Sequence, residues 1–511
     1  MSPPPVPETT LVVAAGIHTL DPASPSGRRA MLLAGDQILW VGPSARAAPP
    51  HEHEVDLGAA WVCPSFVDAH VHGTAAGLAL TGLDLRGAAS LAECLERLGR
   101  HAAAGTEEVV LGFAWDDEGW PEQRPPSAAD ITAVTGSRAV LLARIDGHSC
   151  VVDPATLARL PLDGLAGVDR DADGRPTGLL REQACEAARR RLMARLPDAQ
   201  LDAARRATCR RAASLGIGGL HEMGHPGISG LADARVWATG DWPVEVHTWW
   251  AQLDGPRDLR PGGDLFLDGS IGSHTAAVFD GYADGGEPGR LFHADEAVAA
   301  FFTTATRAGR GGAVHAIGDR AVDQAVRALE AAAAAIGADA VHACRHRIEH
   351  AEMISPELVT RLRDVGAVVS VQPAFDALWG GPDGLYARRF GPAAACQTNP
   401  LAWFAAAGVP MALGSDAPVT PLDPWAAVQA ATHHQGACGL SRRQALAAHT
   451  LGGRYAAGQD AVGALCTGAR ADFAVWGDDP LAVEDPRDLT CLATVVAGRV
   501  VHGALGVSHP A

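Results

Sequence analysis

Short apolar, β-branched runs alternate with alanine-rich helical runs through most of the chain. "GGAVHAIG" at 311–318 precedes the helical run 319–337, and "HRIEHAEMI" at 346–354 precedes the helical run 355–366. Ser355 and Pro356 are typical of a helix start, and Gly366 of its end. Strand, helix and strand at this spacing predict a parallel sheet, and repetition of the unit favours a (β/α)8 barrel.

The two ends of the chain have a different pattern from the middle. Apolar β segments such as "RAMLLAGDQILWVG" fill residues 8–62, and "ADFAVWG" and "LATVVAGRVVHG" follow near the C-terminus. We therefore expect a composite β-sandwich made of residues 1–64 and 455–511, beside a barrel over 65–454. Residues of about 75–205 fit the barrel rhythm less well, which predicts an insertion after the first barrel strand.

Polar residues stand at the ends of several of the predicted strands. His70 and His72 in "SFVDAHVHG" point to the same side of an extended chain because they are two residues apart. His315, His350 and Asp416 each follow a later apolar run. In a barrel all carboxyl ends of the strands meet at one face. Imidazole and carboxylate groups gathered there are suitable ligands for a divalent metal, most simply zinc.

Composition narrows the class of protein further. The net charge of −18 argues against nucleic acid and anionic membranes as partners, and no apolar run is long enough to span a bilayer. The N-terminus lacks the features of a signal peptide, and ten cysteines occur without a CxxC pair. We therefore expect a cytoplasmic protein that acts on a small-molecule substrate. The oligomeric state stays open, with a homodimer as one candidate.

The segments "FVDAHVH", "VHAIGD", "RIEHAE" and "GSDAPV" resemble motifs of the metal-dependent amidohydrolase superfamily, in particular its amidohydrolase-3, YtcJ-like branch. "DGSIGSHTA" and "RIDGHS" are similar to further signatures of that branch. The resemblance implies that His70, His72, His315 and Asp416 bind the metal and that Asp416 takes the proton from the metal-bound water. For His350 it leaves two roles open, metal ligand or a group acting from the substrate side.

The chain contains no lysine, so all 41 basic residues are arginine. Many members of the superfamily bridge two metal ions with a carbamylated lysine, which is impossible here. Where relatives in this branch often have lysine, this chain has Asp264. Either Asp264 bridges two ions as a carboxylate, or the site holds one ion. One ion is the arrangement we favour.

Further polar and aromatic residues are weaker candidates for substrate binding. "GLHEMGHP", around His221, is expected near the end of a third strand, where ordinary polarity explains it as well as function does. Asp268 lies in an Asp-Gly pair that turns favour in any protein. The candidates for contacts with substrate are Asp268, His274, His148, Trp115 and Asp319.

The predicted activity is hydrolysis of a non-peptide C–N bond in an amide, a cyclic amide or an N-acyl group. Hydrolytic deamination of a ring is the alternative within the same chemistry, for which Asp319 in "HAIGDRA" is a candidate acid. A third hypothesis is a degenerate barrel that binds a small molecule without turning it over.

Overall fold

The computed structural model describes residues 8–506, apart from 25–26, 106, 118, 145–148, 163, 286, 437 and 461. The chain forms two compact units. The first unit comprises residues 1–72, 209–226 and 230–511, and the second comprises residues 73–208 and 227–229.

The first unit contains an eight-stranded, nearly closed parallel barrel, which confirms the predicted fold class. The strands, in their order around the sheet, are β6 (Phe66–Val71), β13 (Ile217–Gly224), β14 (Glu245–Trp250), β15 (Arg260–Phe266), β16 (Ala313–Ala316), β17 (Arg347–His350), β18 (Val368–Val371) and β19 (Met411–Leu413). All neighbouring pairs in this order are parallel.

The barrel closes between its first and last strands just where the polar residues begin. Val71 pairs with Ala417 in a parallel bridge, and the Asp416 amide donates to the carbonyl of His70 at 2.8 Å. Buried Asp68 accepts the amide of Ser415 at 2.9 Å, which ties β6 to the loop after β19. Closure therefore brings Asp416 beside the histidines of the first strand.

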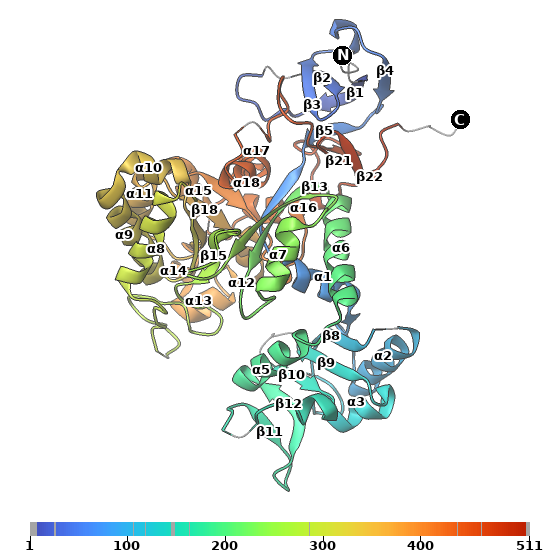
Figure 1. The fold of residues 1–511 in the computed structure, drawn as a ribbon, viewed down its shortest axis with the longest axis vertical. Coiled ribbons are helices and arrows are strands. Elements are labelled where there is room, and N and C mark those ends of the chain that lie inside the picture. The colour runs from blue at the N-terminus through green and yellow to red at the C-terminus, as the bar shows by residue number, and fades with distance from the viewer. Residues whose placement is uncertain are drawn as a thin grey trace. The chain divides into compact units, whose positions relative to one another are not determined.

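Helices cover the outer side of the barrel. Figure 1 shows α8, α9, α10 and α11 stacked outside the strands. The Ser355 hydroxyl accepts the amide of Leu358 and Pro356 opens α11, so the predicted helix start is confirmed. The helices that include first-unit residues are α6 (Asp198–Ser214), α7 (Leu231–Thr239), α8 (Asp295–Arg307), α9 (Asp319–Ile336), α10 (Ala338–Cys344), α11 (Pro356–Asp364), α12 (Pro373–Trp379), α13 (Leu385–Phe390), α14 (Pro392–Ala395), α15 (Leu401–Ala407), α16 (Pro424–Thr432), α17 (Arg442–Ala447) and α18 (Gly453–Ala456). The shorter turns are η1 (Ala45–Ala47), η2 (Ala448–Gly452) and η3 (Pro486–Asp488).

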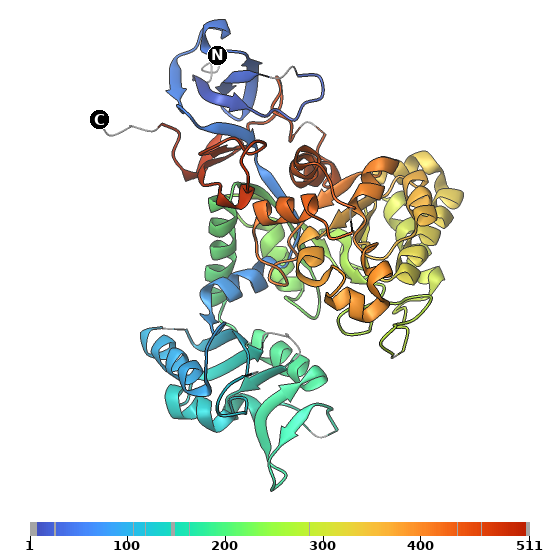
Figure 2. The same ribbon diagram turned by 180° about the vertical axis from the view of Figure 1, so that it is seen from behind.

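Strands from both ends of the chain share one sheet in the first unit. Figures 1 and 2 show the first strands in blue beside the last strands in red. Val12, Met31 and Ile38 from the N-terminal part pack in one core with Phe473 and Val495 from the C-terminal part. The strands are β1 (Thr9–Ile17), β2 (Arg28–Ala34), β3 (Gln37–Gly42), β4 (His53–Asp56), β5 (Trp61–Pro64), β20 (Phe473–Trp476), β21 (Cys491–Val496) and β22 (Arg499–Gly503).

The second unit folds around a sheet of its own. Alternate residues of its central strands face two cores: Leu111 and Leu141 pack on one side, and Val110 and Val140 on the other. The strands are β7 (Leu83–Asp84), β8 (Val109–Trp115), β9 (Ala139–Arg144), β10 (Ser149–Val152), β11 (Val168–Arg170) and β12 (Pro176–Arg181). The helices are α1 (Gly73–Thr81), α2 (Leu91–Ala104), α3 (Ala128–Thr135), α4 (Pro154–Leu157) and α5 (Glu182–Met193).

One strand assignment from the sequence is wrong. The segment around His221 lies on β13, which is the second barrel strand and not the third. Strand order around a barrel depends on pairing, and β13 pairs directly with β6.

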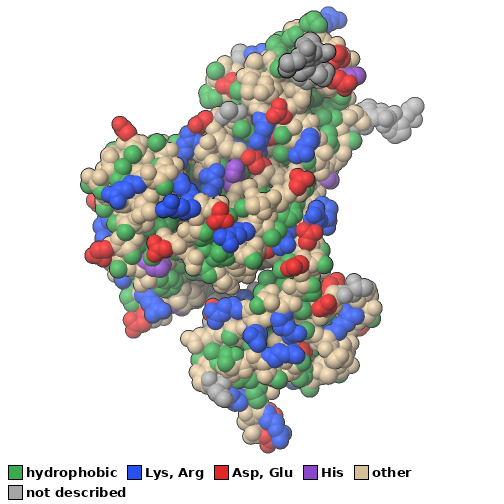
Figure 3. All heavy atoms as spheres, in the orientation of Figure 1, with side chains coloured by type: hydrophobic (Ala, Val, Ile, Leu, Met, Phe, Trp, Pro, Cys, Tyr) green, Lys and Arg blue, Asp and Glu red, His purple; other side chains and the backbone are tan. Residues whose placement is uncertain are grey.

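The surface mixes both signs of charge. Figure 3 shows acidic and basic side chains interspersed over one face of the molecule. Among the described residues, every helix is too short or too polar to cross a bilayer.

Buried His346 makes the stability of the first unit depend on pH. The Gly312 amide donates to its Nδ1 at 2.9 Å, and burial lowers the pKa of His346 to about 4. The unfolded chain binds a proton below about pH 6.5 and the folded chain does not, so stability falls as the pH decreases from 6.5 towards 4. By pH 5 this group should lower the free energy of unfolding by about 2 kcal/mol. Urea unfolding of the wild type and His346→Gln at pH 7 and pH 5 measures this, and equal losses in both proteins would refute it.

Candidate active site

Five of the predicted site residues converge at the carboxyl end of the barrel strands. His70 and His72 stand at the end of β6, Asp264 on β15, His350 at the end of β17, and Asp416 beyond β19. Each is at most 7% exposed. The barrel therefore collects three imidazoles and two carboxylates in a buried space.

The donor atoms of this group have the separations that one small cation requires. His72 Nε2 lies 3.3 Å from Asp416 Oδ1 and 3.4 Å from Asp264 Oδ2, and His70 Nε2 lies 3.5 Å from Asp416 Oδ1. His350 Nε2 is 3.6 Å from Asp264 Oδ1. Two ligand atoms about 2.1 Å from a tetrahedral zinc ion are about 3.4 Å apart. The distances fit such an ion.

The protonation of the three imidazoles supports the same conclusion. Each uses its Nδ1 proton in a hydrogen bond to an acceptor, so its Nε2 directs a lone pair at the carboxylates. Nε2 atoms this close to carboxylate oxygens require a positive charge between them, either a metal ion or a proton on the imidazole. In the described part of the chain, His70 Nε2 and Asp416 Oδ1 are buried without a hydrogen-bond partner. The Nδ1 bonds join His70 to Glu349 at 2.9 Å, His72 to the Met223 carbonyl at 3.0 Å and His350 to Gln372 at 2.8 Å.

Two groups of three residues in the described chain have ligand atoms all within 4.8 Å of one another. One is His70, His72 and Asp416, and the other is His70, Asp264 and His350. His315 belongs to neither, although the resemblance had implied a metal-ligand role for it. Its Nδ1 lies 3.0 Å from Asp264 and its Nε2 lies 3.2 Å from the Gly269 carbonyl.

Charges within the cluster shift its proton affinities. Burial alone would lower the pKa of His72, but hydrogen bonds to Asp264 and Asp416 raise it well above its usual range. Burial likewise opposes the shift at His350, where Asp264 and Asp416 raise the pKa to about 9. Burial would raise the pKa of Asp264, yet His315, His350 and His72 hold it well below its ordinary value. The site thus favours a bound positive charge.

The backbone at the site is strained. His350 and Asp416 adopt positive φ values of 70° and 55°, which residues other than glycine rarely do. Such strain persists only where surrounding contacts fix it, and it is concentrated at functional sites.

Glu349 has a role that the sequence did not reveal. It is the neighbour of His350 in the sequence, but it accepts the Nδ1 proton of His70, from a different strand. Arg347 holds the carboxylate through Nε at 2.8 Å and Nη2 at 2.9 Å. The alternation of "RIEH" could have indicated this, because Arg347 and Glu349 share one face of β17.

Glu349→Gln is expected to weaken metal binding by about 10–100-fold, because the amide no longer fixes the orientation and basicity of His70. Titration of the metal against a competing chelator measures the change. Glu352→Gln is the matched control, since Glu352 is equally buried but accepts a hydrogen bond from Tyr386. Equal effects of both substitutions would contradict the role assigned to Glu349.

The carboxylate of Asp268 accepts hydrogen bonds from three backbone amides. The donors are the amides of Ala277, Ile317 and Gly318 at 2.8–3.0 Å, and the residue is completely buried. Burial raises the pKa of Asp268, while these hydrogen bonds oppose the rise. This arrangement anchors the loop after β15 beside the site.

The remaining candidates for substrate contact are not part of the cluster of histidines and carboxylates. His274 pairs with Asp284 at 3.0 Å on the same loop. Asp319 accepts the amide of Phe279 at the start of α9. Trp115 is 1% exposed in the core of the second unit and donates to the Leu142 carbonyl, so packing accounts for it. His148 lies outside the described residues.

A cavity of about 490 Å³ has Phe266, Phe292, His225 and His293 among its lining residues, and none of the five cluster residues lines it. The Phe266 ring packs against His315, at 4.7 Å between centroids, and against His225 at 4.6 Å. The volume is typical of small-molecule sites. No strong sequence signal marked Phe266 or Phe292, because aromatic residues after a strand usually belong to a core.

Barrel and site together define a metal-dependent barrel hydrolase. The Amidohydrolase family matches residues 53–502, so the chain belongs to this family, whose members act on C–N bonds.

Relatives cover nearly the whole chain. It is 28% identical to the putative amidohydrolase YtcJ of Bacillus subtilis (strain 168), over 89% of this chain and 91% of the relative. It is 26% identical to an N-substituted formamide deformylase of Arthrobacter pascens, over 96% and 97%. The crystal structure of an uncharacterized metal-dependent hydrolase from Pyrococcus furiosus is similar with a TM-score of 0.77 at 26% identity, over 93% of this chain and all of that chain.

Proposed function

We propose that this protein hydrolyses the C–N bond of a small N-acyl amide, using one zinc ion held by His70, His72 and Asp416. The observation that carries the proposal is the set of buried Nε2 atoms that face carboxylate oxygens at the separations of zinc ligands. Three protein ligands leave a coordination position open, as catalytic zinc sites require.

One ion is proposed because the two possible ligand groups share an atom. Both contain His70, and its Nε2 has a single lone pair, so two independent three-residue sites cannot be filled together. Asp264 then serves as an anionic neighbour, with Oδ2 towards His72 and Oδ1 towards His315 and His350.

A zinc ion bound at this site lowers the pKa of the attacking water and polarises the acyl carbonyl. In the proposed reaction the water oxygen bonds to the acyl carbon, Asp416 accepts the water's proton, and the C–N bond breaks. Asp416 returns a proton to the leaving nitrogen, giving a carboxylic acid and an amine. His350, whose ring centroid lies 4.9 Å from that of His70, contacts the acyl oxygen in the proposed reaction.

The cavity lined by Phe266, whose ring packs against His315, supports a substrate with an apolar or aromatic group. Phe266 and Phe292 supply ring surface there, and His225 and His293 supply polar edges. The Arthrobacter pascens relative is named for acting on N-substituted formamides, which are N-acyl compounds of this kind.

A substrate panel tests the proposal. Zinc-loaded protein is incubated with N-alkyl and N-aryl formamides and acetamides, cyclic amides and amino-substituted heterocycles, and released amine and ammonia are assayed separately. Release of amine from the N-acyl compounds is the expected result. Release of ammonia from heterocycles alone would indicate a deaminase. No turnover of any compound would leave a barrel that only binds.

A further inference from the structure

A second cavity lies at the opposite end of the barrel strands. It has a volume of about 530 Å³, and its lining residues include Arg260 and Arg347, the first residues of β15 and β17. The proposed active site is at the carboxyl ends of the same strands. Arg347 and His350 stand three residues apart along β17, which is about 10 Å.

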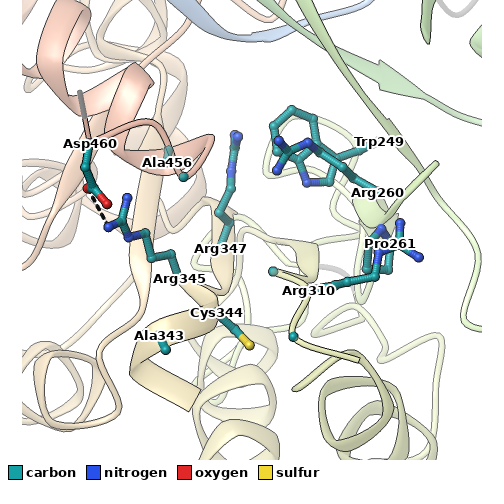
Figure 4. A pocket seen from close by; sticks show the side chains of 13 residues that line it. Trp249, Arg260, Pro261, Arg310, Ala343, Cys344, Arg345, Arg347, Ala456 and Asp460 are labelled. Carbon is teal, nitrogen blue, oxygen red and sulfur yellow. Dashed lines mark hydrogen bonds and ion pairs between the residues drawn. The ribbon is translucent and has the colours of Figure 1, made fainter. Parts of the chain in front are cut away.

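Arginine dominates the charge of this cavity. Its only ionisable lining residues besides Cys344 are four arginines and one aspartate, and Figure 4 shows Arg345 and Arg347 reaching it from one side and Arg260 and Arg310 from the other. The chain as a whole has a net charge of −18. The overall composition of so acidic a protein therefore does not account for a cationic cavity.

Two of the four arginines have acidic partners. Arg347 is buried and bound to Glu349, and Arg345 pairs at 2.5 Å with Asp460, whose side chain is 71% exposed. Arg345 also lies 4.0 Å from the ring of Tyr455. Their positions are therefore fixed by the protein itself.

Arg260 and Arg310 lack such partners. Neither forms an ion pair with a carboxylate in the part of the chain that the structure describes, and each donates one hydrogen bond to a backbone carbonyl, of Ala457 and Leu259 respectively. Arg260 also lies over the Trp249 ring at 5.0 Å. Burial, with the charges of Arg347 and Arg310, lowers the pKa of Arg260, so these cations repel one another. Most of their five N–H donors remain available for a ligand.

We propose that this cavity binds a small phosphate-bearing molecule through Arg260 and Arg310, supported by Arg345 and Arg347. Guanidinium groups present paired N–H donors that match phosphate oxygens in two-point hydrogen bonds. A phosphate between Arg260 and Arg310 would supply a countercharge in direct contact with both guanidinium groups, which Glu245 and Asp258 influence only from beyond ion-pair distance. The volume lies in the range of about 300–1,000 Å³ usual for small-molecule sites, so it holds more than the phosphate group alone.

Calorimetric titration of the full-length protein tests the site, with inorganic phosphate and glycerol 3-phosphate as probes at constant ionic strength. The wild type should bind, and Arg310→Gln and Arg260→Gln should each weaken binding at least tenfold. Arg499→Gln is the matched control, because it removes the same charge from an exposed position on β22. Tighter binding of the ester assigns an organic phosphate, and equal binding assigns the free anion.

Phosphate also has affinity for metal ions, so the two ends of the barrel must be distinguished. Binding to the arginine cavity should persist in His70→Ala, whose substitution lies at the other end of the strands. If phosphate binding disappeared in His70→Ala but survived in Arg310→Gln, the proposal would be overturned. It would also be overturned if the wild type bound neither probe at millimolar concentration. Where Arg310→Gln does not fold, Arg310→Lys keeps the charge and loses the paired donors, and a several-fold weakening is expected.

Discussion

Replacing Asp416 with asparagine is expected to lower kcat about 10³-fold on any substrate that the panel identifies. An amide cannot accept the water's proton, and positioned general bases contribute about 10²–10⁴-fold to rates. Steady-state kinetics at saturating zinc measures the change, with metal content determined on the same preparation.

Asp488→Asn is the control for this substitution, because Asp488 is exposed on η3 and has no contact with the barrel site. It should retain full activity. If Asp416→Asn retained both its metal and wild-type kcat, Asp416 could not be the proton acceptor, and the mechanism proposed above would be wrong.

His70→Ala is expected to abolish both tight metal binding and activity. His70 contributes to both candidate ligand groups and is completely buried, so no neighbouring side chain can take its place without moving the strand. Its removal also leaves Glu349 without the imidazole that it holds. Elemental analysis of the dialysed variant, with amide turnover in parallel, measures both losses.

The chain offers a matched control in a second His-x-His pair. His51 and His53 have the same spacing, but the side chain of His53 is 58% exposed on β4. His53→Ala should leave metal content and activity unchanged. A metal that stayed bound in His70→Ala, or that was lost in His53→Ala, would place the metal elsewhere in the protein.

The barrel was predictable because its strands and helices alternate with little interruption after residue 310. The polar residues at the strand ends were predictable because each follows an apolar run. They are His70, His72, His350 and Asp416. The position of β13 was not predictable, because strand order around a barrel is set by pairing and not by spacing along the chain. Only the pairing of β13 with β6 shows which strand comes second.

Contacts between distant strands were also beyond the sequence. Glu349 is adjacent to His350 in the sequence, yet it binds His70 across the barrel. The arginine cavity is built from five separated segments of chain, and none of its arginines belongs to a recognisable motif. Register and curvature of the closed sheet decide both arrangements, and neither is visible in residue spacing.

The sequence left two roles open for Asp264, a bridge between two metal ions or a neighbour of one ion. The absence of lysine directed attention to this position, and the structure places its carboxylate within 3.9 Å of all four histidines at the strand ends. A carboxylate so placed suits a neighbour of one ion as well as a bridge between two. The shared Nε2 of His70 is the reason for preferring one.

The most direct test of the central claim is the metal content of the wild-type chain, measured by inductively coupled plasma mass spectrometry after dialysis against metal-free buffer. About one zinc ion per chain is the predicted result. Two ions per chain would contradict the one-ion site and make Asp264 the bridge. Protein that holds no metal after growth or incubation with zinc, cobalt or manganese would contradict the claim that this cluster is a metal centre.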